Sequence, residues 1–165
     1  MKFELKNVKH AEFASKETPC YQATLYIDGK RTAQVSNDGQ GGCDMVHPVE
    51  PITENRQRLQ AAEEHLAGLP PIVADFKNDD GSPFSYAQSL ETECGRLLDE
   101  WLLKRDIKKA LKRIVYVHTG TTKPVYQLVA KHKPTPANLA RVAESRPEWT
   151  VLNTLPFNDL LKYWV

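Results

Sequence analysis

Residues 21–35 read YQATLYIDGKRTAQV and alternate apolar with polar side chains on both sides of Asp28-Gly29. A period of two is typical of half-buried strands, and Asp-Gly between two such runs predicts a hairpin. A three-residue loop over residues 27–29, followed by a bulge, would place Tyr21 opposite Val35. That register groups the apolar side chains on one face better than a two-residue loop does, so we predict it.

The sequence on both sides of this hairpin predicts the remaining elements. They are strands at 2–6, 21–27 and 31–35, a loop at 36–51, a helix at 54–67 capped by Thr53, a connector at 72–83, a helix from 85, a hairpin at 113–129, a helix at 136–145 and a docked tail from 149. We therefore expect an α+β fold in a single domain, residues 1–165. An antiparallel sheet of about five strands would carry four to five helices.

The longest helical pattern begins at a capping box, Ser85 to Gln88, and its apolar face changes sides near Leu103. Up to Leu102 the apolar residues share one side of the helical wheel, whereas from Leu103 onward they share another. Two outcomes remain open. The helix breaks between Leu103 and Asp106, which we slightly favour, or it continues and buries different faces at its two ends.

Composition excludes several classes of protein. Of the 165 residues, 41% are hydrophobic and 26% are charged, which is enough for a packed core and unlike a disordered chain. No stretch approaches the 18 apolar residues of a membrane-spanning helix, and the charged start MKFELK is unlike a signal peptide. The three cysteines have no paired spacing, so we expect no disulfide framework and a cytoplasmic location.

Charge is unevenly distributed along the chain. Residues 1–100 hold 10 Lys and Arg against 17 Asp and Glu, whereas residues 101–165 hold 12 against 4. The net charges are thus −7 and +8. Such asymmetry predicts an acidic and a basic surface, which either neutralise each other within the fold or in a dimer, or meet charged partners.

The basic residues of the second half concentrate in one segment with helical spacing. On the helical wheel they lie opposite the apolar side chains of 103–114; they are Lys104, Arg105, Lys108, Lys109, Lys112 and Arg113. A row of cations opposite an apolar face is suited to tracking phosphates. Lys123, Lys131 and Lys133 would extend it, and Tyr116 or Tyr126 would stack on bases if exposed. The alternative is a solvated helix end whose cations suit the macrodipole.

The loop after the third strand is rich in glycine and polar residues. Its candidate ligand-binding residues are Asp38, Gly39, Gly41, Gly42, Cys43, Asp44 and His47. Glycines permit a nest of backbone N–H groups that binds an anion, but the Gly-Lys-Ser/Thr ending of a P-loop is missing. An irregular turn is the simpler interpretation.

Cys43 and His47 have the spacing of half a zinc site, and no second pair completes it, so we predict neither a metal nor a cofactor. The same two residues are also a candidate nucleophile and base, with Asp38 or Asp44 to orient the imidazole. No lysine or arginine in the loop would lower the thiol pKa, so we expect no catalytic residues here.

The order of three strands and a helix resembles small DNA-binding domains, such as the arm-binding domain of tyrosine integrases, and the second half of double-stranded-RNA-binding domains. The resemblance covers Tyr21–Val35 with its Asp28-Gly29-Lys30 turn. Residues 1–48 hold six Lys and Arg and six Asp and Glu, so this part has no basic surface to support the corresponding function. The resemblance therefore concerns the order of elements, and no family follows from it.

Three functional hypotheses remain. The first is a small non-enzymatic protein that binds nucleic acid, or a nucleic-acid-handling complex, through its basic helix face. The second is a protein-interaction or inhibitor module of the phage or mobile-element type, which would use the acidic surface of residues 50–100 (11 acidic against 4 basic residues). The third is an enzyme centred on Cys43 and His47. DNA versus RNA, the protein partner and the oligomeric state stay open.

Overall fold

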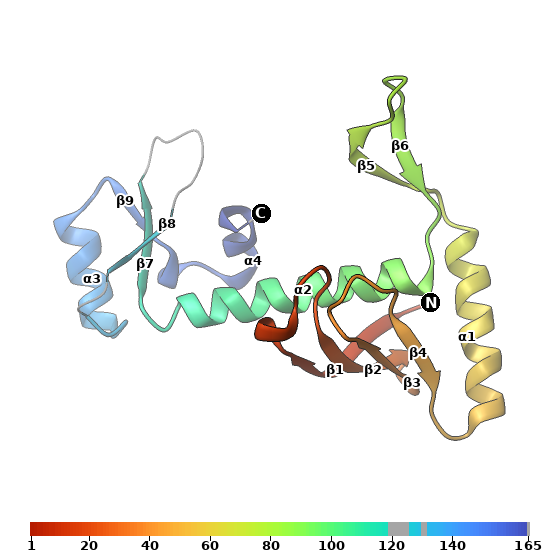
Figure 1. The fold of residues 1–165 in the computed structure, drawn as a ribbon. Coiled ribbons are helices and arrows are strands. Elements are labelled where there is room, and N and C mark those ends of the chain that lie inside the picture. The colour runs from red at the N-terminus through yellow and green to blue at the C-terminus, as the bar shows by residue number, and fades with distance from the viewer. Residues whose placement is uncertain (119–125, 130–131, 165) are drawn as a thin grey trace. The chain divides into compact units, whose positions relative to one another are not determined.

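A computed structural model describes residues 1–118, 126–129 and 132–164 of the chain (Figure 1). The chain divides into two compact units, Met1–Asp99 and Glu100–Val165. Within the described residues, no helix has both the length and the apolar character needed to cross a membrane. Whether the two units unfold together is a question of cooperativity, so the expectation of a single domain stays a prediction.

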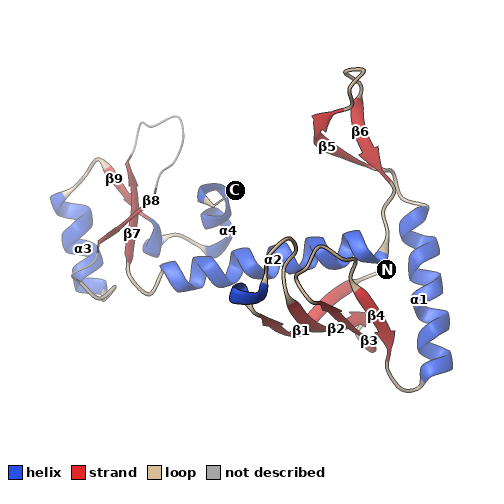
Figure 2. Cartoon of the chain, viewed as in Figure 1, coloured by secondary structure: helices blue, strands red, loops and turns tan. Residues whose placement is uncertain are grey.

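The first unit is built on a four-stranded antiparallel sheet (Figure 2). Its strands lie in the order β1-β2-β3-β4 and span Phe3–His10, Tyr21–Ile27, Lys30–Asn37 and Met45–Pro48. A 3₁₀ turn at Glu12–Ala14 precedes β2. Helix α1 (Ile52–Ala67) follows, and then a separate two-stranded hairpin of β5 (Ile72–Lys77) and β6 (Pro83–Tyr86). Strand β4 lies where we expected only loop, and the hairpin lies where we expected a connector.

The register that we predicted for the β2–β3 hairpin is wrong: Tyr21 pairs with Asn37, and Val35 pairs with Ala23. Ile27 pairs with Lys30, so the turn has two residues, Asp28 and Gly29, both with positive φ (49° and 77°). Positive φ at both positions matches the right-handed twist of the strands. The bulge instead falls at Thr32, between the Leu25–Ala33 and Tyr26–Arg31 pairs. Apolar residues therefore still oppose one another, but through a bulge inside the strand.

Helix α2 spans Leu90–Ala110 without a break, so the break that we favoured is wrong. Its first half buries Cys94 and Leu98 in the first unit, whereas its second half buries Ile107 in the second. The change of apolar face predicted from the sequence thus reflects one helix that contributes to two units.

The start of α2 also lies further along than expected, because Ser85 belongs to β6. The capping residues are Ser89 and Thr92: the Ser89 hydroxyl accepts from the Thr92 N–H (3.2 Å), and the Thr92 hydroxyl accepts from the Ser89 N–H (2.9 Å). Glu63 accepts from the Leu90 N–H at 2.6 Å. Likewise α1 begins after Pro51, and Thr53 lies inside the helix.

The second unit packs helices on a three-stranded sheet in the order β8-β7-β9. Its elements are β7 (Ile114–His118), β8 (Tyr126–Val129), α3 (Pro136–Ser145), β9 (Trp149–Val151), α4 (Phe157–Leu160) and two 3₁₀ turns at Leu152–Thr154 and Leu161–Tyr163. The predicted α3, with its Thr135 cap, is confirmed (Thr135 Oγ1 accepts from the Asn138 N–H at 3.3 Å).

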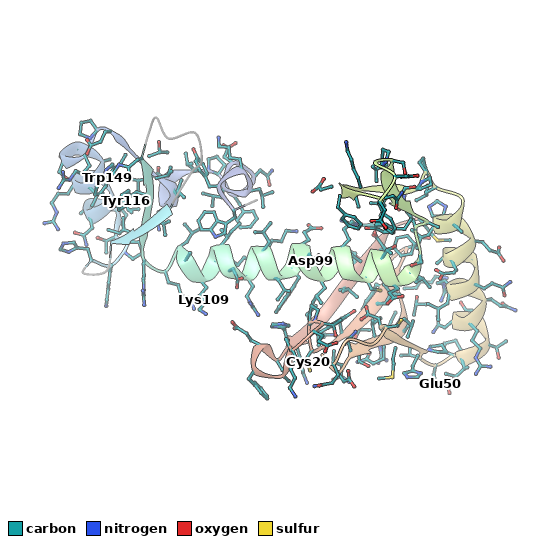
Figure 3. All side chains as sticks on the ribbon, turned by 45° about the horizontal axis from the view of Figure 1, so that its top comes forward. Cys20, Glu50, Asp99, Lys109, Tyr116 and Trp149 are labelled. Atoms are coloured by element: carbon teal, nitrogen blue, oxygen red, sulfur yellow. The ribbon has the colours of Figure 1, made fainter. Side chains whose placement is uncertain are left out.

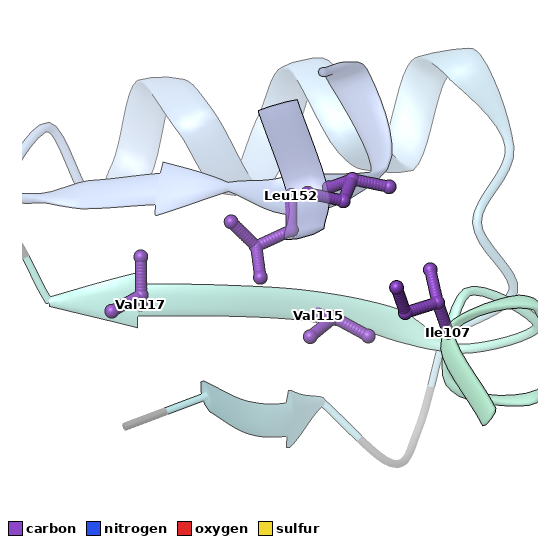
Figure 4. Packing of buried hydrophobic residues seen from close by; sticks show 5 residues of the cluster. Ile107, Val115, Val117 and Leu152 are labelled. Carbon is purple, nitrogen blue, oxygen red and sulfur yellow. The ribbon is translucent and has the colours of Figure 1, made fainter. Parts of the chain in front are cut away.

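A compact core joins one face of β7 to α2 and the tail (Figure 4). Its buried members are Ile107, Val115, Val117, Leu152 and Leu160. The tail therefore docks, as predicted from its apolar residues. The α+β class is confirmed, although the strands form three separate sheets rather than one sheet of about five.

Candidate functional site

The six predicted cations lie along the second half of α2 and the turn that follows it. Lys104, Arg105, Lys108 and Lys109 belong to the helix, which ends at Ala110. Lys112 and Arg113 lie in a turn closed by hydrogen bonds from the Lys112 N–H to the Lys109 carbonyl (3.3 Å) and from the Arg113 N–H to the Ala110 carbonyl (2.9 Å). The helix is thus shorter than predicted. We call residues 108–113 the basic turn.

Two of the six cations are paired with carboxylates. Lys104 forms an ion pair with Glu100, and Arg105 with Asp106 at 2.9 Å. Arg105 also lies 5.6 Å from the centre of the Trp101 ring. Both pairs are partly exposed and solvent screens them, so they contribute little to stability.

The cations of the basic turn differ from Lys104 and Arg105 in having no carboxylate partner among the described residues. Lys108, Lys109, Lys112 and Arg113 are exposed, and no ion pair within the described part of the chain involves any of them. Together with Trp101, Lys104 and Arg105, the three lysines line an open depression of about 570 Å³; Lys109 is labelled in Figure 3. Four positive charges without carboxylate partners among the described residues therefore lie within six residues of chain.

Asn153 fixes the backbone of the basic turn. Its amide nitrogen donates to the carbonyls of Leu111 (3.1 Å) and Arg113 (2.9 Å), and its amide oxygen accepts from the Val115 N–H (2.7 Å). One side chain from the tail thereby satisfies three backbone groups between the end of α2 and the start of β7. The cations of the turn are consequently presented by a defined backbone.

A second candidate site lies on the other face of β7. Tyr116 stacks on Trp149 of β9, with ring centres 3.5 Å apart and planes 5° from parallel. The guanidinium of Arg146 lies 5.2 Å from the centre of the Trp149 ring. These residues line a depression of about 610 Å³ that also includes Arg141 and His132. The pocket thus combines aromatic and cationic groups.

The glycine-rich loop is held by its own side chains. Asn37 Nδ2 donates to the Gly42 carbonyl (2.9 Å) and to Asp44 (3.0 Å), and Asn37 Oδ1 accepts from the Gly39 N–H (2.9 Å). Asp44 also accepts from the Tyr21 hydroxyl, and burial with this carboxylate beside it raises the pKa of the tyrosine. Asp44 and Gly39 thus serve the loop itself, which favours the structural interpretation.

The proposed Cys43 and His47 pair is not assembled. No hydrogen bond among the described residues joins them, and His47 is exposed on β4, opposite Gln34. Glu91 hydrogen-bonds the Cys43 thiol and raises its pKa, which is the wrong direction for a nucleophilic thiolate. Asp38 is exposed and accepts from the Gln40 N–H (3.1 Å). The part of the chain that the structure describes holds no group of three metal-ligating residues.

The comparisons with known proteins supply no family: no protein-family model, curated protein or solved structure matches the chain. The function of the chain must therefore be inferred from the two sites described above. Sequence reasoning found the basic turn and Tyr116. It missed Trp149, Arg141 and Arg146, which are distant from Tyr116 in sequence and which no local pattern identifies as site residues.

The expectation that Tyr116 stacks on bases needs correction, and the side chains of three other predicted residues lie outside the described part of the structure. Tyr116 is only 7% exposed, so it supports Trp149 and is not itself an open stacking surface. Lys123, Lys131 and the side chain of Tyr126 lie outside the described residues.

Proposed function

We propose that the chain is a non-enzymatic protein that binds nucleic acid through the basic turn of its second unit. The observation that carries the proposal is the set of four exposed cations, Lys108, Lys109, Lys112 and Arg113, without carboxylate partners among the described residues. Residues 100–165 hold 12 Lys and Arg against 5 Asp and Glu, a net charge of +7, so the long-range field of this unit attracts polyanions.

Binding of this kind depends on phosphates and on counterion release. Lysines track the backbone as point charges and carry no sequence information, so DNA or RNA of any sequence would bind. If four phosphates are neutralised, raising the salt concentration from 50 to 200 mM weakens duplex binding about 150-fold. Strong salt dependence with little sequence preference is the expected signature.

The decisive experiment is a charge reversal in the basic turn. The double variant Lys108→Glu with Lys112→Glu keeps the helix, because both side chains are exposed and unpaired within the described structure. We expect at least a tenfold loss of affinity for a fluorescein-labelled 20-base-pair duplex at 50 mM salt, and a shallower salt dependence.

Net charge alone would also weaken binding, so a matched control is needed. Lys16→Glu with Arg56→Glu changes two exposed residues of the first unit and has the same effect on net charge. We expect this control to bind nearly as the wild type does. Equal affinities for both double variants, or no duplex binding by the wild type, would refute nucleic-acid binding through the basic turn.

A second candidate function is supported by the β5–β6 hairpin. Val73 and Phe76 are 64% and 60% exposed, and Phe76 stacks on Phe84 at 4.8 Å. The hairpin also carries Asp75 and the acidic turn Asp79-Asp80. A two-stranded hairpin with exposed aromatic rings is suited to a basic protein partner. Capture of such a partner that persists after nuclease treatment and is lost in Phe76→Ser would favour this function.

A further inference from the structure

The strand register of the second unit places three aromatic rings on one side of its sheet. Tyr116 and His118 are two residues apart on β7 and therefore share a face, and Trp149 pairs directly with His118. The His118 ring meets the rings of Tyr116 and Trp149 edge-on, with centres 5.8 and 5.5 Å apart. The buried Tyr116 supports Trp149, which remains partly exposed (Figure 3). Trp149 is thus held as a rigid platform.

The charged side chains in the described lining of this pocket are all basic. The described lining of the pocket includes Arg141, Arg146 and His132, and no carboxylate. Both arginines are exposed and form no ion pair with described residues; Arg141 makes one long hydrogen bond, to Asn138 Oδ1 at 3.4 Å. Their guanidinium groups are free to turn toward phosphate oxygens, which they bind in a bidentate manner.

Trp149 has a further unusual feature. Its indole Nε1–H is buried and has no hydrogen-bond acceptor among the described residues. Buried donors without an acceptor are rare in proteins, and each calls for a water molecule, a ligand or another explanation. Trp149 thus combines an unused donor with two neighbouring arginines that form no ion pair with described residues.

We propose that this pocket binds a nucleobase of single-stranded nucleic acid, which stacks at Trp149 while Arg141 and Arg146 hold the flanking phosphates. The proposal rests on the proposed function and specifies its substrate. In a duplex, bases are stacked on one another and their faces are inaccessible, whereas a single strand can turn a base out onto an aromatic ring. The basic turn tracks phosphates of either form, and the pocket adds affinity for the single strand alone.

Stacking of a base on Trp149 requires the guanidinium of Arg146 to move away from the ring. At 5.2 Å from the ring centre it leaves too little room for a base between itself and Trp149. Because its side chain is exposed and has no ion pair among described residues, it can swing aside at small cost and then bind the phosphate next to the incoming base.

The test compares two probes at 50 mM salt: fluorescein-labelled (dT)12 and a 12-base-pair duplex. We expect the wild type to prefer the single strand and its tryptophan fluorescence to be quenched by unlabelled (dT)12. Arg146→Ala should weaken (dT)12 binding about tenfold, the order of one hydrogen bond to a charged phosphate, and change duplex binding much less. Trp149→Phe keeps an aromatic ring and should remove the part of the quenching that comes from Trp149, while Trp101 beside the basic turn still reports strand binding. Lys162→Ala, another exposed cation of the second unit, is the matched control.

The outcomes separate this inference from the proposed function. If the wild type binds both probes equally and Arg146→Ala matches the control, the pocket is not a base site, although the basic turn still binds phosphates. If the wild type binds neither probe, both proposals fall. If Arg146→Ala lowers (dT)12 binding but Trp149→Phe leaves the quenching intact, phosphate alone is recognised and base stacking is refuted.

Discussion

Replacement of Asn153 by alanine tests whether one side chain holds the basic turn in place. The variant removes the acceptor of the Val115 N–H and the donors to the carbonyls of Leu111 and Arg113. Val115 is fully buried, so its N–H would lose its partner without access to water, at a cost of about 1–3 kcal/mol. The carbonyls of the partly exposed Leu111 and the exposed Arg113 can be rehydrated, and each contributes about 0.5 kcal/mol.

The expected loss of stability is therefore about 3 kcal/mol. With a urea m-value of about 2 kcal/mol/M, the unfolding midpoint would fall by about 1.5 M. All three tryptophans, Trp101, Trp149 and Trp164, lie in residues 100–165, so tryptophan fluorescence follows the second unit specifically. Urea titrations monitored by this signal give the midpoint directly.

Two further variants serve as a control and as a partial replacement in this experiment. Asn158→Ala changes an exposed asparagine of α4 for which the structure records no hydrogen bond, and its midpoint should stay within about 0.3 M of the wild type. Asn153→Asp keeps an acceptor for Val115 but loses both donors, so we expect a partial loss. A midpoint for Asn153→Ala equal to that of Asn158→Ala, at an unchanged m-value, would refute the assignment of Asn153 as the residue that fixes the turn.

Three other predictions follow from the first unit and from the chain as a whole. In Gly39→Ala the new Cβ would lie 2.4 Å from the Ala14 carbonyl oxygen at a positive φ of 82°, so thermal denaturation should show a loss of at least about 2 kcal/mol; Gly42→Ala, which opens into free space, should lose under about 1 kcal/mol. Because Glu91 raises the pKa of Cys43, less thiolate is present at a given pH, and its alkylation should need a higher pH than that of free cysteine. Glu91→Gln should shift this rate profile back, and rapid alkylation near neutral pH would contradict the structure. If the chain is a single cooperative domain, urea transitions measured by tryptophan fluorescence and by far-ultraviolet circular dichroism should coincide, whereas separate midpoints would indicate two domains.

The differences between predicted and observed elements arise where local signals compete with distant contacts. Registers that differ by two residues keep the same side chains on the same face, so the predicted Tyr21–Val35 pairing and the observed Tyr21–Asn37 pairing both group the apolar residues of β2 and β3. Apolar grouping therefore could not select the register, and the observed one has a two-residue turn at Asp28 and Gly29 with a bulge at Thr32. Similarly, Ser85 and Ser89 are both reasonable caps. Glu63 of α1, which accepts from the Leu90 N–H, favours the later start, and this contact is 27 residues away in sequence.

The candidate sites differ in predictability for the same reason. The basic turn is a local feature: its cations are close in sequence, and helical spacing alone groups them on one side. The aromatic pocket requires Tyr116 and Trp149 to meet from strands that are more than thirty residues apart, and the pairing of β7 with β9 brings them together. No pattern within either strand specifies that pairing. A sequence can therefore reveal a local cluster of cations, whereas the stacked pair of Tyr116 and Trp149 becomes visible only once the sheet has formed.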